Sequence, residues 1–197
     1  MFTGIIEELG SVVELEPRAA GARIRIQCAK VLEDLTEGAS IAVNGVCLTA
    51  VSITPESFSA DLAPETLSRS NLGALTVKSP VNLERPVTPA TRLSGHIVQG
   101  HVDARGEIVG LDELGDGNWW LKVRVPQSLD RYLVHKGSIA IDGISLTIAS
   151  LEDGPVVGVT IIPHTIAHTT LGSARIGSIV NIEVDVLAKH VEKLLAK

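Results

Sequence analysis

The sequence predicts an all-β protein, built of two homologous antiparallel Greek-key barrels and a short C-terminal α-helix. Three observations lead to this fold: an internal repeat, short segments in which apolar and polar residues alternate, and closely spaced turn signals. Alternation with a period of two is typical of strands that have one buried face. Frequent turns between short strands favour a small barrel or sandwich.

The repeat consists of three blocks that recur in the same order, at an offset of 98 or 99 residues. The paired blocks are 40–49 with 138–147 (SIAVNGVCLT and SIAIDGISLT), 64–73 with 163–172 (PETLSRSNLG and PHTIAHTTLG), and 81–84 with 180–183 (VNLE and VNIE). A weaker pair sets residues 4–6 against 100–102, at an offset of 96. A period of this length is that of a domain, so we expect two homologous barrels, at residues 1–88 and 97–186, joined by a linker that contains two prolines.

Short strands and tight turns are predicted within each module. Residues 22–26 and 120–125 alternate between apolar and polar side chains, as a strand with one buried face does. The dipeptides at 44–45 (Asn-Gly) and 142–143 (Asp-Gly) favour the positive φ angles of a two-residue hairpin loop. We therefore expect each dipeptide to join two antiparallel strands of its barrel.

The last residues follow a different pattern, that of a helix over residues 187–197. Asp185 is a suitable N-cap, and Leu187, Val191 and Leu194 recur at helical spacing on one face. An isolated helix of this length is unstable in water, so its apolar stripe must pack against another surface. The pattern leaves open whether that surface is its own barrel or another subunit.

Composition and charge exclude several classes of protein. The net charge of −6 argues against a nucleic-acid partner. No apolar run approaches the roughly 18 residues that a membrane span requires. The first ten residues, MFTGIIEELG, lack the basic region of a signal peptide, and the two cysteines, Cys28 and Cys47, are expected to be reduced. We therefore expect a cytoplasmic location.

Three segments carry polar or nucleophilic residues that the architecture alone does not require. Cys47 and Thr49 are two residues apart, so on a strand both point to the same face. Ser145 and Thr147 have the same spacing at the equivalent place in the second module. The third segment, SGHIVQGH at 94–101, has glycines that allow another backbone or a ligand to approach closely.

Each of these residues also has a purely structural interpretation. A free cysteine in a strand is most often a small buried hydrophobic residue, and Ser and Thr near a hairpin often cap turns. His96 and His101 are five apart and face opposite ways on a strand, so they do not suggest a shared metal. His164 and His168 would share a helical face but have no carboxylate or cysteine nearby in the sequence. No metal site is therefore predicted, and pattern alone leads only to a duplicated β-barrel protein with a polar pocket.

Taken together, these motifs resemble the α-chain family of riboflavin synthases over essentially the whole chain. The segments that carry the resemblance are 1–5 (MFTGI), 44–49 (NGVCLT), 70–73 (SNLG), 95–101 (GHIVQGH), 136–137 (KG), 142–147 (DGISLT) and 170–172 (TLG). The resemblance implies that each of the two barrels has six strands. It also implies a homotrimer with residues 187–197 as an oligomerisation helix. It also implies an active site between the N-terminal barrel of one subunit and the C-terminal barrel of a neighbour, and it leaves open an association with lumazine synthase.

The activity that the resemblance implies is the last step of riboflavin biosynthesis. One molecule of 6,7-dimethyl-8-ribityllumazine donates a four-carbon unit to a second, which gives riboflavin and 5-amino-6-(ribitylamino)uracil. The C7 methyl group of the substrate is acidic, because its anion is delocalised into the ring, so no cofactor is expected. The protein would orient two rings and move protons, and orientation of paired reactants is worth about 7–11 kcal/mol.

Carried over residue by residue, the family's binding residues fall into two half-sites, one for each lumazine. The first half-site is implied to consist of Gly4, Ile5, Ile6, Cys47, Leu48, Thr49, Asp61, Leu62, Ala63, Pro64, Glu65 and Thr66. The second is implied to consist of Gly100, His101, Val102, Lys136, Ser145, Leu146, Thr147, Ile162, Pro163, His164, Thr165, Ile166 and Ala167. The side chains of His164 and Ala167 depart from the family's pattern, which often has Glu and a longer polar residue at these places.

The roles of the polar residues are expected as follows. His101 is the leading candidate for general acid and base, because an imidazole near its own pKa suits proton transfer at neutral pH. Ser145 and Thr147 would bind the ring or relay a proton, and Cys47 occupies the equivalent place in the other half-site. A hydroxyl, the thiol or a water molecule could each add to C7 of the acceptor lumazine. Lys136 would bind ring oxygens or stabilise the carbanion.

The main alternative is a non-catalytic lumazine- or flavin-binding relative of the antenna type, which has the same fold. Such relatives have lost much of the segment equivalent to residues 95–101 and the paired Cys-Leu-Thr and Ser-Leu-Thr motifs, all of which are present here. A flavin-reductase barrel would need a dinucleotide-binding domain, and no GxGxxG motif follows a strand in this chain. A purely structural β-protein would give no reason for polar residues to recur at matched positions in both modules.

Overall fold

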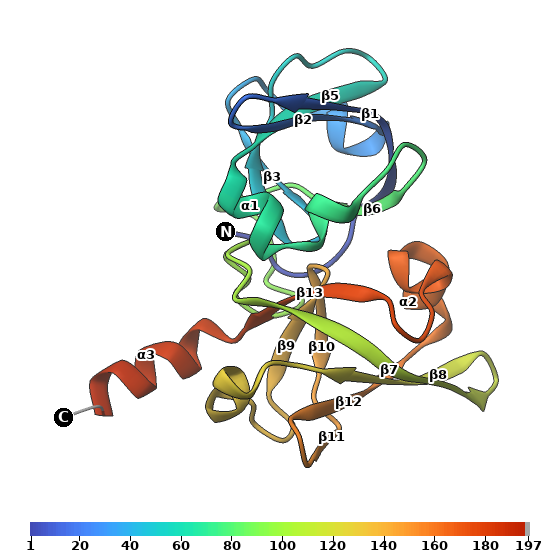
Figure 1. Cartoon of the computed structure of the whole chain (residues 1–197), viewed down its shortest axis with the longest axis vertical. Coiled ribbons are helices and arrows are strands. Elements are labelled where there is room, and N and C mark those ends of the chain that lie inside the picture. The colour runs from blue at the N-terminus through green and yellow to red at the C-terminus, as the bar shows by residue number, and fades with distance from the viewer. Residues whose placement is uncertain (196–197) are drawn as a thin grey trace.

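The protein consists of two lobes, each built on an antiparallel sheet, with one lobe stacked on the other (Figure 1). A computed structural model describes residues 1–195. The first sheet consists of β1 (Glu8–Arg18), β2 (Gly21–Gln27), β3 (Ser40–Val43), β4 (Val46–Thr49), β5 (Ser57–Leu62) and β6 (Pro80–Glu84). The second consists of β7 (Ala104–Gly115), β8 (Asn118–Arg124), β9 (Ser138–Ile141), β10 (Ile144–Thr147), β11 (Ser150–Glu152), β12 (Val156–Ile161) and β13 (Ile179–Val184).

The helices are short and lie at the ends of strands. The 3-10 helices are η1 (Lys30–Glu33), η2 (Asn71–Ala74), η3 (Gln127–Tyr132) and η4 (Thr170–Ser173), and the α-helices are α1 (Pro64–Arg69), α2 (Pro163–His168) and α3 (Val186–Leu195). Both α1 and α2 begin with a proline. Proline fits the first turn of a helix because a backbone N–H at that position would have no partner within the helix. In residues 1–195, no helix has the length and apolar character to span a membrane.

The two sheets have the same strand order, which confirms an all-β fold made of two related antiparallel units. The order is β4-β3-β6-β1-β2-β5 in the first sheet and β10-β9-β13-β7-β8-β12-β11 in the second. The second sheet therefore has seven strands where six were expected. The additional strand β11 pairs with β12, whereas the corresponding part of the first unit forms only a single bridge between Val51 and Ser59.

Each unit buries its own hydrophobic core. Strands contribute alternate side chains to these cores, as their predicted period of two requires. The fully buried side chains of the first core include Ile24, Ile41, Phe58 and Leu83. Those of the second include Ile108, Leu121, Ile139 and Ile182. Burial of one such side chain is worth about 1.5–3 kcal/mol, so each core contributes strongly to the stability of its unit.

The two predicted hairpin loops meet at the boundary between the units. Asn44 and Gly45 have φ angles of 46° and 74°, and Asp142 and Gly143 have φ angles of 47° and 79°, so both loops have the expected two-residue geometry. A Cβ on Gly45 would lie 2.6 Å from the backbone nitrogen of Gly143. Glycine therefore permits the two loops to touch.

A buried network of amide side chains joins the two units around these loops. Asn181 of β13 donates from Nδ2 to the carbonyl oxygen of Asn44 at 2.8 Å, and Asn82 of β6 donates to the carbonyl oxygen of Asp142 at 2.9 Å. Asn71 donates from Nδ2 to Oδ1 of Asp142 at 2.9 Å. A buried polar group without a hydrogen-bond partner destabilises the folded protein. These bonds between the barrels therefore fix the two barrels relative to each other.

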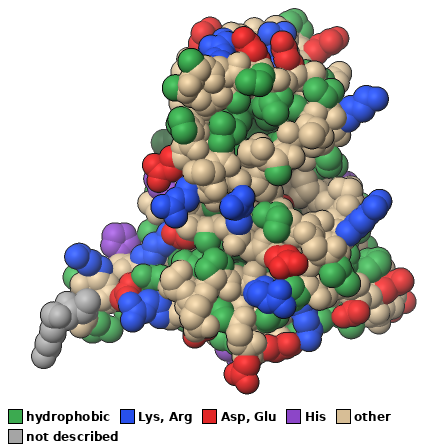
Figure 2. Space-filling view, viewed as in Figure 1, with side chains coloured by type: hydrophobic (Ala, Val, Ile, Leu, Met, Phe, Trp, Pro, Cys, Tyr) green, Lys and Arg blue, Asp and Glu red, His purple; other side chains and the backbone are tan. Residues whose placement is uncertain are grey.

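Helix α3 begins at Val186 and projects from the second barrel (Figure 2). The predicted N-cap is confirmed, since the backbone nitrogen of Leu187 donates to Oδ1 of Asp185 at 2.9 Å. Leu187, Val191 and Leu194 have exposed fractions of 58%, 54% and 85%, so most of their apolar surface is not covered within the chain. Residues 196 and 197, the end of the predicted helix, lie outside the described residues.

Candidate active site

The strands β4 and β10 carry the polar pairs that the sequence singled out. In β4 the side chains of Val46 and Leu48 are buried, whereas Cys47 is half-buried and Thr49 is exposed. The prediction that Cys47 and Thr49 share one face is therefore confirmed. Because Leu48 belongs to the first core, only its backbone is available to a ligand.

Strand β10 repeats this arrangement in the second barrel. Ser145 is half-buried and Thr147 is exposed, which again places the two predicted residues on the outer face. Leu146 is less buried than its counterpart Leu48 and packs at the edge of the second core. The two site strands therefore present similar but not identical surfaces, with a hydroxyl on one where the other has a thiol.

Two irregular segments run between the barrels: the N-terminal crossing segment, residues 2–6, and the central crossing segment, residues 95–102. They pair antiparallel, since the backbone nitrogen of Phe2 donates to the carbonyl oxygen of Val98 at 2.6 Å and the reverse bond is 3.1 Å long. Phe2 and Val98 are buried in a small third cluster, apart from the two barrel cores. Both segments are therefore fixed in the interface between the barrels.

The N-terminal crossing segment precedes the first barrel but contacts β10, the site strand of the second. The central crossing segment precedes the second barrel but contacts β4, the site strand of the first. The carbonyl oxygen of Gly4 accepts a hydrogen bond from the backbone nitrogen of Ser145 in β10 at 2.8 Å. The carbonyl oxygen of Gly100 accepts one from the backbone nitrogen of Cys47 in β4, also at 2.8 Å. Both glycines have positive φ angles, 78° and 81°, and a Cβ on either would lie 2.6 Å from the Cβ of the facing Ser145 or Cys47. Only glycine allows this approach without displacement.

The structure therefore places each crossing segment beside the other site strand than expected. Residues 4–6 were expected with β4 and residues 100–102 with β10, but Gly4 contacts β10 and Gly100 contacts β4. In the structure Ile6 packs against the second core and Val102 against the first. The repeat identifies the two segments as equivalent, but equivalence does not reveal which barrel a segment reaches, because that depends on contacts between distant residues.

Two buried carboxylates, which the sequence analysis did not select, anchor the crossing segments. Glu84 of β6 accepts from the backbone nitrogens of Thr3 at 2.6 Å and Gly4 at 3.0 Å. Glu183 of β13 accepts from the backbone nitrogens of residues 99–101 at 2.6, 2.9 and 2.9 Å. Burial raises the pKa of both carboxyl groups, and the N–H donors that each accepts oppose this rise. The signal that could have found them is their place at the end of the repeated VNLE and VNIE blocks.

A histidine that the sequence pattern placed in neither half-site lies against the site serine. Nδ1 of His96 is 2.7 Å from Oγ of Ser145, and the His96 side chain is only 8% exposed. Within residues 1–195 its Nε2 has no hydrogen-bond partner. Burial lowers the pKa of His96, so the imidazole is neutral at physiological pH. His101, by contrast, has an exposed ring and lies beside β4, in the first half-site.

The segment 61–66 leads from β5 into α1 on the first barrel. Asp61 is held by two hydrogen bonds from Arg23, at 2.7 and 2.8 Å, and this interaction lowers the pKa of the Asp61 carboxyl. Leu62 is buried in the core, whereas the side chains of Ala63, Pro64 and Glu65 are exposed. Apart from Leu62, this segment is therefore accessible at its side chains.

The equivalent segment, 162–167, leads from β12 into α2 on the second barrel. Its Ile162 is 53% exposed, whereas Ile166 packs against the core. The ring of His164 stacks on that of His168, with a centroid distance of 4.2 Å. The His164 ring is thus engaged by its helical neighbour.

Lys136 lies at the end of the β9–β10 hairpin that contains Thr147. Its backbone nitrogen donates to the carbonyl oxygen of Ile148 at 2.8 Å, and its φ angle is 66°. The equivalent residue of the first barrel is Gly38, which has a φ angle of 85° and makes the same bond to Ala50. The same turn is therefore formed by a glycine in the first barrel and by a lysine in the second.

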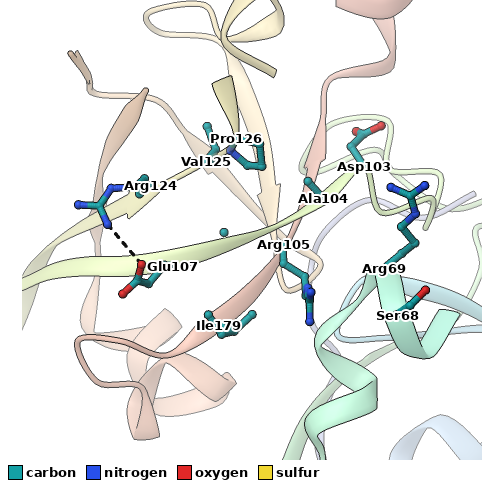
Figure 3. Close-up of a pocket in the computed structure, with 11 residues that line it drawn as sticks. Ser68, Arg69, Asp103, Ala104, Arg105, Glu107, Arg124, Val125, Pro126 and Ile179 are labelled. Carbon is teal, nitrogen blue, oxygen red and sulfur yellow. Dashed lines mark hydrogen bonds and ion pairs between the residues drawn. The ribbon is translucent and has the colours of Figure 1, made fainter. Parts of the chain in front are cut away.

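Two cavities of the single chain share only Ile5 with the predicted site residues. A cavity of about 650 Å³ lies between α1 and the start of β7, and the side chains of Arg69, Arg105 and Arg124 line it (Figure 3). Within it Arg124 is paired with Glu107 at 3.3 Å. None of the predicted site residues lines this cavity. A smaller cavity of about 410 Å³, beside the N-terminal crossing segment, includes Ile5 in its lining.

Comparison with known sequences identifies relatives over the full length. The family model of the lumazine binding domain matches twice, at residues 3–86 and 99–185. A riboflavin synthase of Mycobacterium bovis is 51% identical over 199 residues, covering 99% of this chain and 98% of the relative. Riboflavin synthases of Actinobacillus pleuropneumoniae and Bacillus subtilis are 47% and 43% identical over 197 residues, each covering 100% of this chain and 91% of the relative.

Solved structures of the protein LumP have the same fold. The complex of LumP with riboflavin superposes with a TM-score of 0.87, and the complex with 6,7-dimethyl-8-(1'-D-ribityl) lumazine with a TM-score of 0.84. Both are 24% identical to this chain and cover 93% of it and 99% of LumP. At this identity the likeness establishes the architecture alone.

Proposed function

This chain belongs to the riboflavin synthase family, and from that membership we propose where and how it joins two lumazines. The reaction transfers a four-carbon unit between two molecules of 6,7-dimethyl-8-ribityllumazine, and it yields riboflavin and 5-amino-6-(ribitylamino)uracil. The observation on which the proposal rests is that each site strand is completed by a crossing segment of the other barrel. Two related half-sites are a direct way to bind two identical substrates.

Each half-site is proposed to combine residues of both barrels. The first consists of Cys47, Leu48, Thr49, residues 61–66, and Gly100, His101 and Val102. The second consists of Ser145, Leu146, Thr147, Lys136, residues 162–167, and Gly4, Ile5 and Ile6. This grouping follows the hydrogen bonds from Cys47 to Gly100 and from Ser145 to Gly4.

Ser145 is proposed to add to C7 of the lumazine in the second half-site. Its Oγ is 2.7 Å from Nδ1 of His96. A neutral imidazole at that distance accepts the hydroxyl proton as the new carbon–oxygen bond forms, as bases do for serine nucleophiles. Cys47 has the equivalent position in the first half-site.

His101 is proposed to remove the C7 methyl proton of the lumazine in the first half-site. Its ring is exposed at the outer face beside β4, where a ligand has access to it. Its backbone nitrogen is fixed by Glu183 at 2.9 Å, which limits the positions that the ring can take. A positioned imidazole contributes about 10²–10⁴-fold to a proton transfer.

The two half-sites are proposed to face each other between subunits of a homotrimer. Thr49, Thr147 and His101 are exposed in the single chain, so both half-sites are open to the outside. The apolar stripe of α3 is exposed as well, and it would be covered by a neighbouring subunit. A cytoplasmic location and an association with lumazine synthase stay predictions from the sequence.

The proposed function is tested by incubating the purified chain with 6,7-dimethyl-8-ribityllumazine alone. We expect one riboflavin for every two lumazines consumed, without added metal or cofactor, measured by the absorbance of riboflavin. The second candidate is a non-catalytic protein of the same fold that binds the lumazine, as LumP does in its complex. Saturable binding of the lumazine without riboflavin formation would establish that candidate instead.

A further inference from the structure

The last strand of each barrel carries a buried carboxylate that the proposed reaction does not use. Glu84 and Glu183 are only 4% and 3% exposed. A carboxylate is costly to bury unless strong hydrogen bonds replace its water. Both side chains bind a crossing segment in the interface between the barrels. Glu84 pairs with Ala42 and Glu183 with Ala140, and both alanines belong to the small third cluster. The hydrogen bonds that Glu84 and Glu183 accept must therefore compensate for the burial of their charge.

Each carboxylate is the first member of a chain of hydrogen bonds that ends in the other barrel. Glu183 accepts from the backbone nitrogen of Gly100 at 2.9 Å, and the carbonyl oxygen of Gly100 accepts from Cys47 of the first barrel at 2.8 Å. Glu84 accepts from the backbone nitrogen of Gly4 at 3.0 Å, and the carbonyl oxygen of Gly4 accepts from Ser145 of the second barrel at 2.8 Å. The two relays are related by the internal repeat.

We propose that Glu84 and Glu183 are positioning residues, each of which holds its crossing segment against the site strand of the other barrel. Glu183, in the second barrel, thus sets the first half-site, including His101. Glu84, in the first barrel, sets the second half-site, around Ser145. The consequence for turnover rests on the proposed function, whereas the structural coupling between barrels does not.

The chemistry of the contacts requires a carboxylate. At Glu183 three N–H groups converge on two oxygens, and at Glu84 two N–H groups and the hydroxyl of Thr3 do so. An ionised carboxylate offers acceptor sites on both oxygens. A glutamine of nearly the same size offers one oxygen, and its amide N–H₂ would oppose a backbone N–H. Substitution by glutamine therefore removes the clamp and leaves the side-chain volume nearly unchanged.

The test compares hydrogen exchange in full-length Glu84→Gln and Glu183→Gln chains, read by mass spectrometry in peptides that contain the amides of Cys47 or Ser145. In Glu183→Gln we expect exchange at the Cys47 amide to accelerate about tenfold or more while the Ser145 amide is unchanged, since a lost hydrogen bond to a charged group has this effect. In Glu84→Gln we expect the reverse. The matched control is Glu152→Gln, which removes an exposed carboxylate paired with Lys122 on the surface of the second barrel.

Turnover of the lumazine is measured on the same samples. We expect kcat to fall by about 10–100-fold in each glutamine variant, with a smaller change in KM, because a displaced crossing segment misaligns the bound rings. The control should keep the parent's kcat. If a glutamine variant does not fold, Glu84→Asp and Glu183→Asp keep the charge but shorten its reach, and they should accelerate exchange in the same cross-barrel pattern.

Faster hydrogen exchange only in the barrel that carries the substitution would overturn the proposal, because a merely structural role of the carboxylate predicts that result. Parent-like kcat in both glutamine variants would overturn it as well. If the parent chain forms no riboflavin, the proposed function fails, but the cross-barrel exchange pattern still decides whether the two carboxylates position the crossing segments.

Discussion

The imidazole of His96 and the hydroxyl of Ser145 lie 2.7 Å apart, although 49 residues separate them in the chain. His96 belongs to the central crossing segment, and Ser145 lies on β10 of the second barrel. The same segment continues to Gly100 and contacts Cys47 of the first barrel. One stretch of chain thus contributes to both half-sites, with His96 in one and His101 in the other.

The first prediction concerns the pH dependence that this pair causes. Burial lowers the pKa of His96, so the imidazole remains a hydrogen-bond acceptor until the pH falls below the usual histidine value of about 6.5. We expect kcat to decline with an acid limb below that value, and His96→Gln to lower kcat by about 10²–10⁴-fold. The pH profile of kcat checks this, with His135→Gln, an exposed histidine of the second barrel, as the control. A parent-like profile in His96→Gln would remove His96 from the mechanism.

The second prediction concerns Asp142 in the interface between the barrels. Burial raises its pKa from 3.8 to about 7, and its Oδ1 accepts from Asn71 and from the backbone of Asn181. Because the pKa of Asp142 is higher in the folded protein than in the unfolded chain, protonation of its carboxyl group stabilises the fold. This contribution to stability is fully present below pH 3.8 and is lost as the pH rises through about 7. Asn44, the equivalent residue of the first barrel, accepts the equivalent backbone bond from Asn82 without a charge.

Asp142→Asn should therefore be tolerated, and above pH 7 it should stabilise the fold by about 2–4 kcal/mol, since one pKa unit corresponds to about 1.4 kcal/mol. The gain should disappear in acid. Denaturant unfolding of parent and variant at several pH values measures it. If the stability difference between parent and variant is the same from about pH 4 to about pH 8, the range set by these two pKa values, Asp142 does not titrate there.

The third prediction concerns the two glycines at which the crossing segments meet the site strands. Gly4→Ala and Gly100→Ala each place a Cβ 2.6 Å from a Cβ of the facing strand. We expect both variants to lose most of their turnover. Gly154→Ala is the matched control, because Gly154 has a similar φ angle of 81° but nothing lies within 4 Å of its added Cβ. Equal losses in all three variants would mean that backbone strain, rather than the close approach, is responsible.

The fourth prediction concerns helix α3. Removal of residues 187–197 should break up the oligomer and lower activity, while each barrel keeps its own core. Light scattering gives the mass, and the riboflavin assay gives the activity. The truncation also removes Glu192, which pairs with Arg131, so Glu192→Gln in the full chain serves as the control for that ion pair. A truncated chain with the parent's mass and activity would show that α3 is only a local cover.

The fold could be predicted from the sequence because its signals are local. The Asn44-Gly45 and Asp142-Gly143 dipeptides determine their own turns, and Asp185 caps the helix that it precedes. Because the sequence is repeated, the same signals occur in both barrels, and each supports the prediction for the other. These features depend on neighbours in the sequence, so a pattern reveals them.

The arrangement of the site could be predicted only in part. The spacing of Cys47 and Thr49 gave their common face, but the partner of Gly4 is Ser145, in the other barrel. Internal symmetry made the two crossing segments equivalent without deciding which barrel each one reaches. The same limit explains why His96 was not placed beside Ser145 and why Glu84 and Glu183 were not selected.

The central claim is that riboflavin forms between two composite half-sites supplied by two copies of the chain, and mixed oligomers test it most directly. His101→Ala should inactivate the first half-site and Ser145→Ala the second, each lowering kcat by about 10²–10⁴-fold. When the two inactive variants are unfolded together and refolded, a subunit with an intact first half-site meets one with an intact second half-site, and activity should return. Mixing Ser145→Ala with His96→Ala, both in the second half-site, should restore nothing. Absence of activity from the His101→Ala and Ser145→Ala mixture, with mixed oligomers verified by mass, would contradict the account.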